Sequence, residues 1–201
     1  MAKKTAEPQV VDLKMINISM IKIRLVGDSP LICHAWSSKA KKMMLDKQMK
    51  KTTVKTVKDP QKDYEESLYV LNGGKVNEKG TVYGFPAVAF KAASVSACRN
   101  LDMKMTMARG AYHVVGDMIV INGEPSMRED MVRVGMGTAD IRYRGEFREW
   151  SADVTIRYNE DVISPEQIIN LFNVAGFAVG VGEWRPEKNG GFGMFHVEGD
   201  A

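Results

Sequence analysis

The segment from Gly180 to Gly193 carries the residues best suited to bind a phosphate or a base. Glycine allows close backbone approach and positive φ, and successive exposed N–H groups can cradle a phosphate. Arg185 and Lys188 add positive charge, and Trp184 could stack on a base. The alternative is a loop whose glycines only turn the chain. Five glycines define this glycine-rich loop: Gly180, Gly182, Gly190, Gly191 and Gly193.

Lysine is concentrated between Lys39 and Lys58, where eight lysines accompany one acidic residue, Asp46. The net charge of +3 and the pI of about 8.8 decide little, so this local clustering is the informative feature. A helix is predicted from Ser37 or Ser38 to about Lys50. Phosphate contact is the functional interpretation, and a solvated face or loop is the alternative. The candidate contacts are Lys39, Lys41 and Lys42.

Basic and aromatic residues are interleaved between Arg142 and Trp150. This pairing suits single-stranded nucleic acid, because bases stack on rings while basic side chains neutralise phosphates. The stretch therefore makes Arg142 and Arg144 candidate contacts. A strand with an apolar core face and a charged outer face is an equally good interpretation.

Catalytic and cofactor chemistry have little support in the sequence. His34, His113 and His196 lie far apart, and Cys33 and Cys98 form no CxxC pair. The glycine-rich loop has no Gly-Lys-Ser/Thr and precedes a strand, so it is not a P-loop. We predict a protein that is not an enzyme and needs no metal or cofactor.

The N-terminal residues 1–14 are polar and are predicted to form a mobile arm. No apolar h-region follows Met1, and no stretch approaches the ~18 apolar residues that a membrane span needs. We therefore expect a cytoplasmic protein with no membrane association.

Alternating hydrophobicity predicts strands in the remaining residues, 15–201. One is expected over 16–26, with a bulge near Met20, and a clear half-buried strand over 149–158. Shorter strands are expected at three further places, namely 112–115, 118–121 and 192–197.

Two helices complete the predicted core. Pro86 suits the first turn of a helix over 87–101, and Ser164 is a strong N-cap for a helix to about Phe177. The order is strand, helix, strand, strand, helix, strand, which is the α+β, ferredoxin-like or RRM-like βαββαβ order. We expect one such domain with insertions at about 30–80 and 122–147, the second of them a hairpin.

Two segments resemble motifs of the RAMP superfamily, the RNA-recognition-motif-like subunits of CRISPR effector complexes. The glycine-rich loop follows the last helix and precedes the last strand, as in that family. The segment 83–99 is similar to the family's Ile-Pro-Gly-Ser-Ser-Leu-Lys-Gly-Ala-Leu-Arg, although Ala87 replaces its first glycine. The residues in comparable places are Pro86, Phe90, Lys91, Ala92 and Arg99.

The resemblance implies RNA binding by repeated backbone subunits. Lys91 and Arg99 would face the strand from the first helix, and the insertion hairpin would act as a thumb. For both residues a solvated helix face is the alternative. The two insertions also resemble those of the family's backbone subunit.

The leading hypothesis is a protein that coats single-stranded RNA or DNA as a filament or ring. A phage structural or interaction protein, or an inhibitor that imitates a CRISPR subunit, is the first alternative. A metal-independent endoribonuclease is the second. The compact size also fits a phage- or plasmid-encoded accessory protein. RNA and DNA cannot be told apart here, because 2′-OH contacts are not readable from residue types.

Overall fold

A computed structural model describes residues 15–51, 57–134 and 137–199, so the predicted arm at 1–14 lies outside the described residues. The larger of the two sheets is antiparallel, with its strands in the order β10-β1-β9-β6-β4-β3, and β5 also pairs with β9. The strands are β1 (Ile18–Gly27), β3 (Tyr69–Val70), β4 (Tyr83–Pro86), β5 (Tyr112–Val114), β6 (Met118–Asn122), β9 (Ser151–Asn159) and β10 (Phe195–Val197).

The two central strands, β1 and β9, follow from alternating side chains. Ala152, Val154, Ile156 and Tyr158 are buried on one face of β9, because a strand directs successive side chains to opposite faces. The register runs without interruption from Ile18 opposite Asn159 to Val26 opposite Ser151. The predicted bulge near Met20 is therefore wrong, since the two parities of apolar residues in β1 fit one regular strand.

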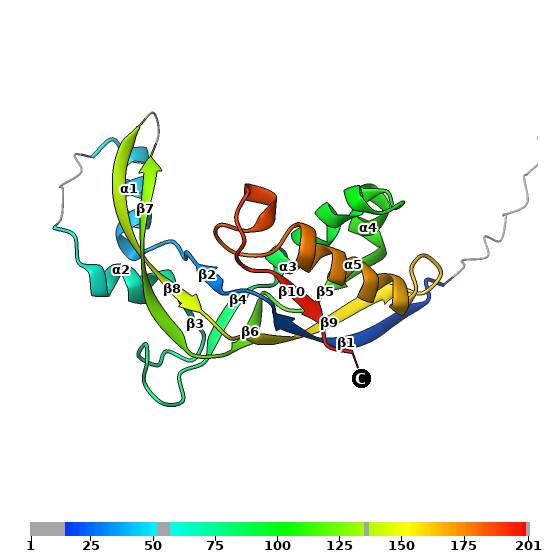
Figure 1. Ribbon diagram of the computed structural model, residues 1–201. Helices are drawn as coiled ribbons and strands as arrows, with labels where there is room; N and C mark the ends of the chain where they lie inside the picture. The colour runs from blue at the N-terminus through cyan, green and yellow to red at the C-terminus, as the bar shows by residue number, and fades with distance from the viewer. Residues whose placement is uncertain (1–14, 52–56, 135–136, 200–201) are drawn as a thin grey trace, which may run out of the picture.

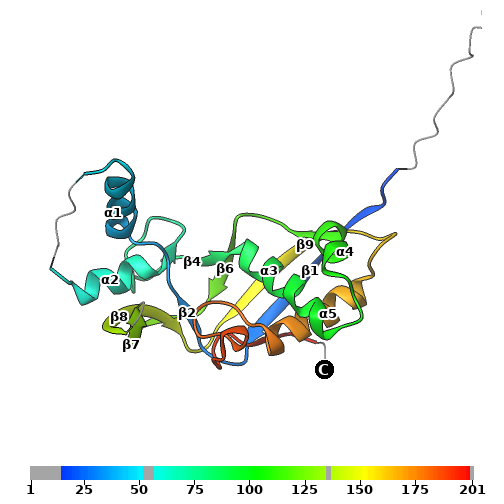
Figure 2. The ribbon, with the colours of Figure 1, turned by 90° about the horizontal axis from the view of Figure 1, so that it is seen from above.

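Helices cover one face of this sheet (Figures 1 and 2). Helix α3 (Ala87–Ala97) packs against α5 (Pro165–Ala178), and the sequence predicted both. A capping box formed by Ser164 and Gln167 fixes the start of α5. The short η1 (Cys98–Asn100) ends α3, and α4 (Met105–Ala111) follows without having been predicted. Phe90, Phe172 and Phe195 are fully buried between helices and sheet.

A second, smaller sheet stands at one end of the main sheet (Figure 1). It has the order β2-β8-β7 and includes the hairpin that the sequence predicted. Two helices lie beside it, and α2 packs against β8. Its elements are β2 (Leu31–Cys33), α1 (Ser38–Gln48), α2 (Pro60–Ser67), β7 (Pro125–Val134) and β8 (Thr138–Phe147). Elements of segments 30–80 and 122–147, far apart in the sequence, thus pack together here, although β3 joins the main sheet.

The chain is an α+β protein with antiparallel sheets, as expected. Two features add to the predicted element order. Strands β3 and β4 extend the main sheet before α3 begins, and β5 and β6 both align along β9 instead of pairing with each other. In the part of the chain that the structure describes, the helices are too short or too polar to span a bilayer.

Candidate nucleic-acid interface

A cavity of about 450 Å³ lies between the hairpin and the glycine-rich loop. We call it the arginine groove, because its lining contains four arginines and one lysine but a single carboxylate among the described residues. The groove brings together five predicted contact residues, from two segments far apart in sequence. Its lining residues are Val132, Arg133, Arg142, Arg144, Glu183, Trp184, Arg185 and Lys188.

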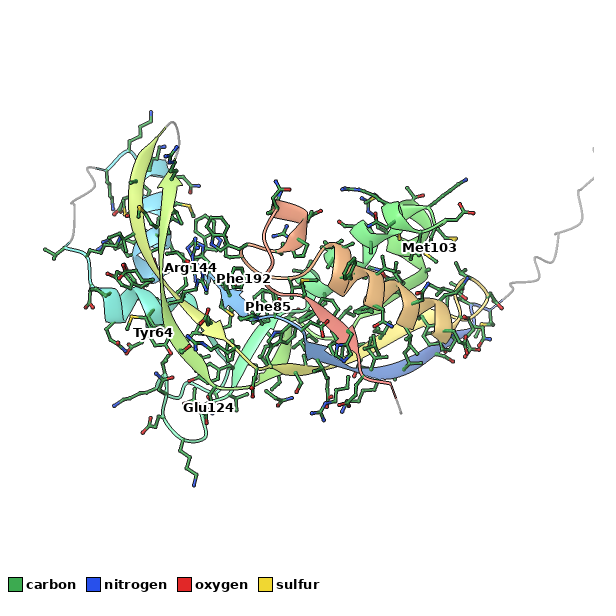
Figure 3. All side chains as sticks on the ribbon, in the orientation of Figure 1. Tyr64, Phe85, Met103, Glu124, Arg144 and Phe192 are labelled. Atoms are coloured by element: carbon green, nitrogen blue, oxygen red, sulfur yellow. The ribbon has the colours of Figure 1, made fainter. Side chains whose placement is uncertain are left out.

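The hairpin wall of the groove rests on a buried ion-pair network. Arg144 is only 4% exposed, and its guanidinium lies 3.3 Å from Asp130 and 3.9 Å from Glu183. Arg128 bonds Asp130 at 2.8 Å and Glu146 at 2.9 Å. These side chains share a face because antiparallel pairing sets Arg128 opposite Arg144. Figure 3 shows Arg144 on the side of the hairpin that faces the C-terminal loop.

Arg144 is incompletely paired within this network. In the described part of the chain, its Nε is the one buried side-chain nitrogen or oxygen that has no hydrogen-bond partner. A buried donor left without an acceptor costs free energy. The positive charge of Arg144 is therefore held beside the groove without being fully satisfied by protein groups.

The glycine-rich loop forms the other wall, and its N–H groups are largely used within the protein. Val181 N–H donates to Gly193 at 2.9 Å, and Gly193 N–H donates to Pro30 at 2.8 Å. Glu183 N–H donates to the carbonyl of Ile32 at 3.1 Å. The expectation that successive N–H groups cradle a phosphate is therefore wrong for these positions. Side chains, not backbone, supply the positive charge of this wall.

Most of the five glycines serve close packing. Gly193 has φ +66°, and a Cβ there would lie 1.7 Å from the carbonyl oxygen of Val181. A Cβ on Gly190 would lie 1.6 Å from the carbonyl of Trp184, whereas one on Gly191 would meet nothing within 4 Å. Gly180 and Gly182 also have positive φ. The loop is thus a packed turn that requires glycine at four positions, namely Gly180, Gly182, Gly190 and Gly193.

A second cavity, of about 530 Å³, adjoins the groove. It lies between β8, α2 and the segment that leads into α1, and three carboxylates line it, those of Asp63, Asp140 and Glu183. We call it the paired cleft because both of its cations, Lys58 and Arg142, have a carboxylate partner. Lys58 bonds Asp140 at 2.8 Å, and Arg142 lies 3.4 Å from the same carboxylate. The indole of Trp36, 63% exposed, lines this cleft.

Glu183 and Arg142 line both cavities. Glu183 lies 3.1 Å from His34 on the cleft side, and Arg144 approaches it from the groove side. The hydrogen bond with His34, with help from the charges of Arg144 and Arg142, holds the pKa of Glu183 below its usual range. Glu183 is therefore an ionised carboxylate at the boundary between the arginine groove and the paired cleft.

Lys91 is placed inside the domain and away from both cavities. Its ammonium donates to the carbonyls of Ala108 and Tyr112 and lies 3.3 Å from the centre of the Tyr112 ring. Burial lowers the pKa of Lys91 to about 8. The contacts tie α3 to the end of α4, so Lys91 is not among the groove residues.

Arg99 and the lysines of α1 lie at the periphery. Arg99 is exposed and reaches Glu187, which is bonded to Arg185 of the glycine-rich loop, at 4.0 Å. Ser37 caps α1, which has no buried residue. Lys41 and Lys42 are exposed and Lys39 is half-buried. None of these three lysines lines the groove or the cleft.

Arg133 and Trp36 are candidate residues that the sequence analysis missed. Arg133 precedes the basic and aromatic stretch that starts at Arg142, and the pairing of β7 with β8 places it in the same groove. Trp36 directly precedes Ser37, the N-cap of α1. A tryptophan just ahead of a helix cap was the signal that could have indicated it.

The face of the main sheet opposite the helices offers another surface, but of a different kind. Its side chains pair with each other, as in Lys22 with Asp153 at 2.8 Å and Arg24 with Glu198 at 3.4 Å. Aromatic stacking platforms are what single-strand binders use, and the aromatic rings of the two cavities lie elsewhere. The candidate basic and aromatic side chains gather at the loops instead.

No family model and no curated protein matches this sequence. Among solved structures, a chain in the cryo-EM structure of the Type III-B Cmr-beta bound to cognate target RNA is similar, with a TM-score of 0.51 and 11% identity. The match covers 91% of this chain and 60% of that chain. The fold of this chain is RAMP-like. Cmr6 from Pyrococcus furiosus is also similar, at a TM-score of 0.47 and 9% identity, covering 92% of this chain and 100% of Cmr6.

The RAMP-like fold agrees with the resemblance seen in the sequence motifs. At 11% identity the likeness concerns the arrangement of strands and helices. The ligand of this chain has to be argued from its own side chains, and the arginine groove is where they gather.

Proposed function

We propose that this chain binds single-stranded RNA, with the phosphates of the strand lying in the arginine groove. The observation that carries the proposal is the groove itself, where Arg133, Arg142, Arg144, Arg185 and Lys188 converge with one carboxylate. Guanidinium groups recognise phosphate oxygens through paired N–H donors. Trp184, 42% exposed at the same place, provides a face on which a base can stack.

RNA is preferred over DNA on the evidence of the similar fold. The structure that contains the similar chain is that of the Type III-B Cmr-beta bound to cognate target RNA. The groove has no feature that reads base sequence, and phosphate contacts carry no sequence information. Binding should therefore show little sequence preference.

We propose further that the chain binds without cleaving, and that copies pack side by side along the strand. Residues 15–201 then act as one domain, a βαββαβ core whose insertions at about 30–80 and 122–147 build the second sheet. A side-by-side contact between unlike surfaces is heterologous and gives open arrays or rings. Light scattering with a long oligonucleotide tests the array, and gel analysis of the same strand after incubation tests cleavage.

The salt dependence of binding tests the proposed groove. If the five basic residues each neutralise one phosphate, log K should fall against log [salt] with a slope of about −3.5, since single strands contribute about 0.7 per contact. Affinity would then fall roughly 100-fold between 50 and 200 mM salt. Fluorescence anisotropy with a labelled homopolymer measures both values. An affinity that stays flat over this range contradicts the proposal.

The effect of removing two charges from the groove can be compared with the effect of removing two charges elsewhere in the chain. The variant R133Q/K188Q should reduce the slope by about 1.4 and weaken binding roughly tenfold at 100 mM salt. Lys75 and Lys79 are exposed on the loop between β3 and β4, outside both cavities. K75Q/K79Q removes the same charge and should leave the slope unchanged. Equal losses in the two variants would mean that net charge, not the groove, drives binding.

A further inference from the structure

We infer that the free edge of β1 is a docking surface for a second copy of this chain, so that two molecules join through antiparallel pairing of their β1 strands. The inference goes beyond the proposed function, because it involves neither cavity and needs no nucleic acid. A two-fold pair is isologous and closed, and it therefore differs from the heterologous contact that would build an array. Three observations lead to it: the free backbone groups of this edge, its exposed apolar side chains, and the apolar stripe of α5 beside it.

The edge of β1 that faces β10 is paired along only part of its length. β10 pairs with the last three residues of β1, and in the described part of the chain no strand lies beside the earlier residues on that side. Glu198 N–H donates to the carbonyl of Arg24 at 2.8 Å, and backbone groups alternate sides along a strand. The N–H and C=O groups of Ile18, Met20 and Lys22 therefore point to the open edge, where another strand can pair with them.

The open edge is apolar and carries no uncompensated charge. Met20 is 67% exposed and Ile18 is 42% exposed, and Ile16, just before the strand, is exposed as well. Lys22 is the one charged side chain of this stretch, and it is bonded to Asp153 at 2.8 Å. An exposed edge with apolar side chains is a template on which another strand pairs.

Other edge strands in the described part of the chain are protected in ways that β proteins commonly use. β3, at the opposite edge of the main sheet, has two residues, and β10 has three. In the smaller sheet, the carbonyl of Ile141 in β8 accepts from Lys58. β7 begins with Pro125 and carries charged side chains along its length, namely Arg128, Glu129, Asp130 and Arg133. The edge of β1 has none of these features, which indicates that a partner covers it.

The helix layer beside this edge is apolar as well. The side chain of Asn173 in α5 accepts a hydrogen bond from the N–H of Val197 in β10 at 2.7 Å, so this side of α5 faces the border of the sheet. Ile169 and Phe177 lie one turn before and one turn after Asn173, and they are 37% and 73% exposed. Figure 1 shows α5 over the strands β1 and β10. The sheet and the helix layer thus present apolar side chains at the same border.

A second copy matches both layers of this border. Around a two-fold axis next to Met20, the N–H and C=O of Met20 meet those of the same residue in the partner, and Ile18 lies opposite the partner's Lys22. The aliphatic stem of Lys22 can cover Ile18 while its ammonium stays with Asp153. The axis also brings the two α5 helices toward each other on one face of the joined sheet. A lone peptide strand would pair with the backbone and leave the α5 stripe uncovered.

The test changes the charge at the axis and measures self-association by sedimentation velocity without nucleic acid. M20K removes two methionines from the contact and sets like charges opposite each other, so it should weaken the dimer at least about 100-fold. M20E should do the same. An equimolar mixture of M20K and M20E should recover the dimer, because opposite charges then meet across the axis. M131K is the matched control, since Met131 is 78% exposed on β7 of the other sheet and should leave the dimer unchanged.

The outcomes separate this inference from the proposed function. A wild type that stays monomeric at tens of micromolar overturns the inference, and so does a dimer that M20K leaves intact. A dimer lost in M131K but kept in M20K would place the contact on the hairpin and also overturn it. Mixed M20K and M20E that stay monomeric would exclude the two-fold axis at Met20. A wild type that dimerises but does not bind the labelled homopolymer would refute the proposed function alone. Far-UV circular dichroism establishes that each variant is folded.

Discussion

The arginine groove and the paired cleft share Arg142 and Glu183, yet their balance of charge differs. Five basic residues and one carboxylate line the groove. Three of the five, Arg142, Arg144 and Arg185, are paired with carboxylates, whereas Arg133 and Lys188 have no ion pair among the described residues. In the cleft both cations pair with Asp140, and Asp63 and Glu183 add further carboxylates. The difference indicates that the class of ligand is set by the charge that is left over after ion pairing.

The two cavities also differ in what holds their walls. Buried ion pairs that involve Asp130, Arg144 and Glu146 hold the hairpin wall of the groove. The other wall is the loop that packs around Gly193. The cleft is bounded on one side by the start of α1, a helix without buried residues. Isolated helices of this length are marginal in water. The groove is therefore preformed, whereas the α1 side of the cleft can adjust to a ligand.

Among these variants, removing Arg144 should lower unfolding free energy and strand binding the most. R144A leaves Asp130 buried with one partner fewer and removes a cation from the groove. Breaking a buried ion pair costs about 3–5 kcal/mol, and we expect about 3 because Arg128 still pairs with Asp130. Urea denaturation gives the loss in unfolding free energy, and anisotropy gives the loss of strand binding.

Arg148 provides the matched control for R144A. It bonds Glu146 of the same hairpin at 3.0 Å, but its side chain is 79% exposed. An exposed pair contributes about 0–1 kcal/mol, so R148A should change stability little. Equal destabilisation by R144A and R148A would show that burial does not support the groove wall.

The loop wall can be tested without removing any charge. G193A places a Cβ 1.7 Å from the carbonyl of Val181 at a residue with φ +66°. Left-handed backbone costs a non-glycine residue about 1–2 kcal/mol, and overpacking adds about 1–3. We expect a loss of about 2–3 kcal/mol in unfolding free energy, measured by urea denaturation, together with weaker binding of the labelled homopolymer.

G191A is the control for the loop, because its Cβ would meet nothing within 4 Å and its φ is not positive. Its stability should stay within about 0.5 kcal/mol of the wild type. A G193A protein that binds the homopolymer normally would remove the loop from the groove.

The sequence predicted those helices and strands whose signals lie within one short stretch of residues. The alternation over 149–158 predicted β9, the Ser164 cap predicted α5, and the insertion at about 122–147 was predicted to be a hairpin. Arg142, Arg144, Trp184, Arg185 and Lys188 were also predicted as candidate contacts, and the structure brings them to one groove. Their binding of nucleic acid stays a prediction.

The remaining features depend on contacts between distant segments. The pairing of β2 with β8, and so the existence of the cleft, has no local signature. Lys91 resembles a surface lysine in sequence, but the carbonyl of Tyr112 and the aromatic ring draw it inward. Glu183 sits between Gly182 and Trp184 and received no prediction, because its role appears only once His34 lies 3.1 Å away.

Among these variants, neutralising Glu183 should change strand affinity and stability the least. It should also distinguish the two cavities most clearly. E183Q removes the one carboxylate that lines the groove among the described residues, so strand binding should tighten about threefold at low salt, as expected for one charge several ångströms away in water. Glu78, exposed on the loop between β3 and β4, is the matched control, and E78Q should leave affinity unchanged.

We also expect the difference in unfolding free energy between the wild type and E183Q to depend on pH. The folded-state pKa of Glu183 lies below its ordinary value of 4.5, so its ionised form stabilises the fold above that pH and the stabilisation is lost as the pH falls through the folded pKa. Because the side chain is 41% exposed, the advantage of wild type over E183Q at pH 7 should be only about 0.5 kcal/mol. Urea denaturation at pH 7 and pH 3 measures it. An advantage that persists at pH 3 would mean that Glu183 stabilises the wall by packing, and that the boundary between the two cavities is not electrostatic.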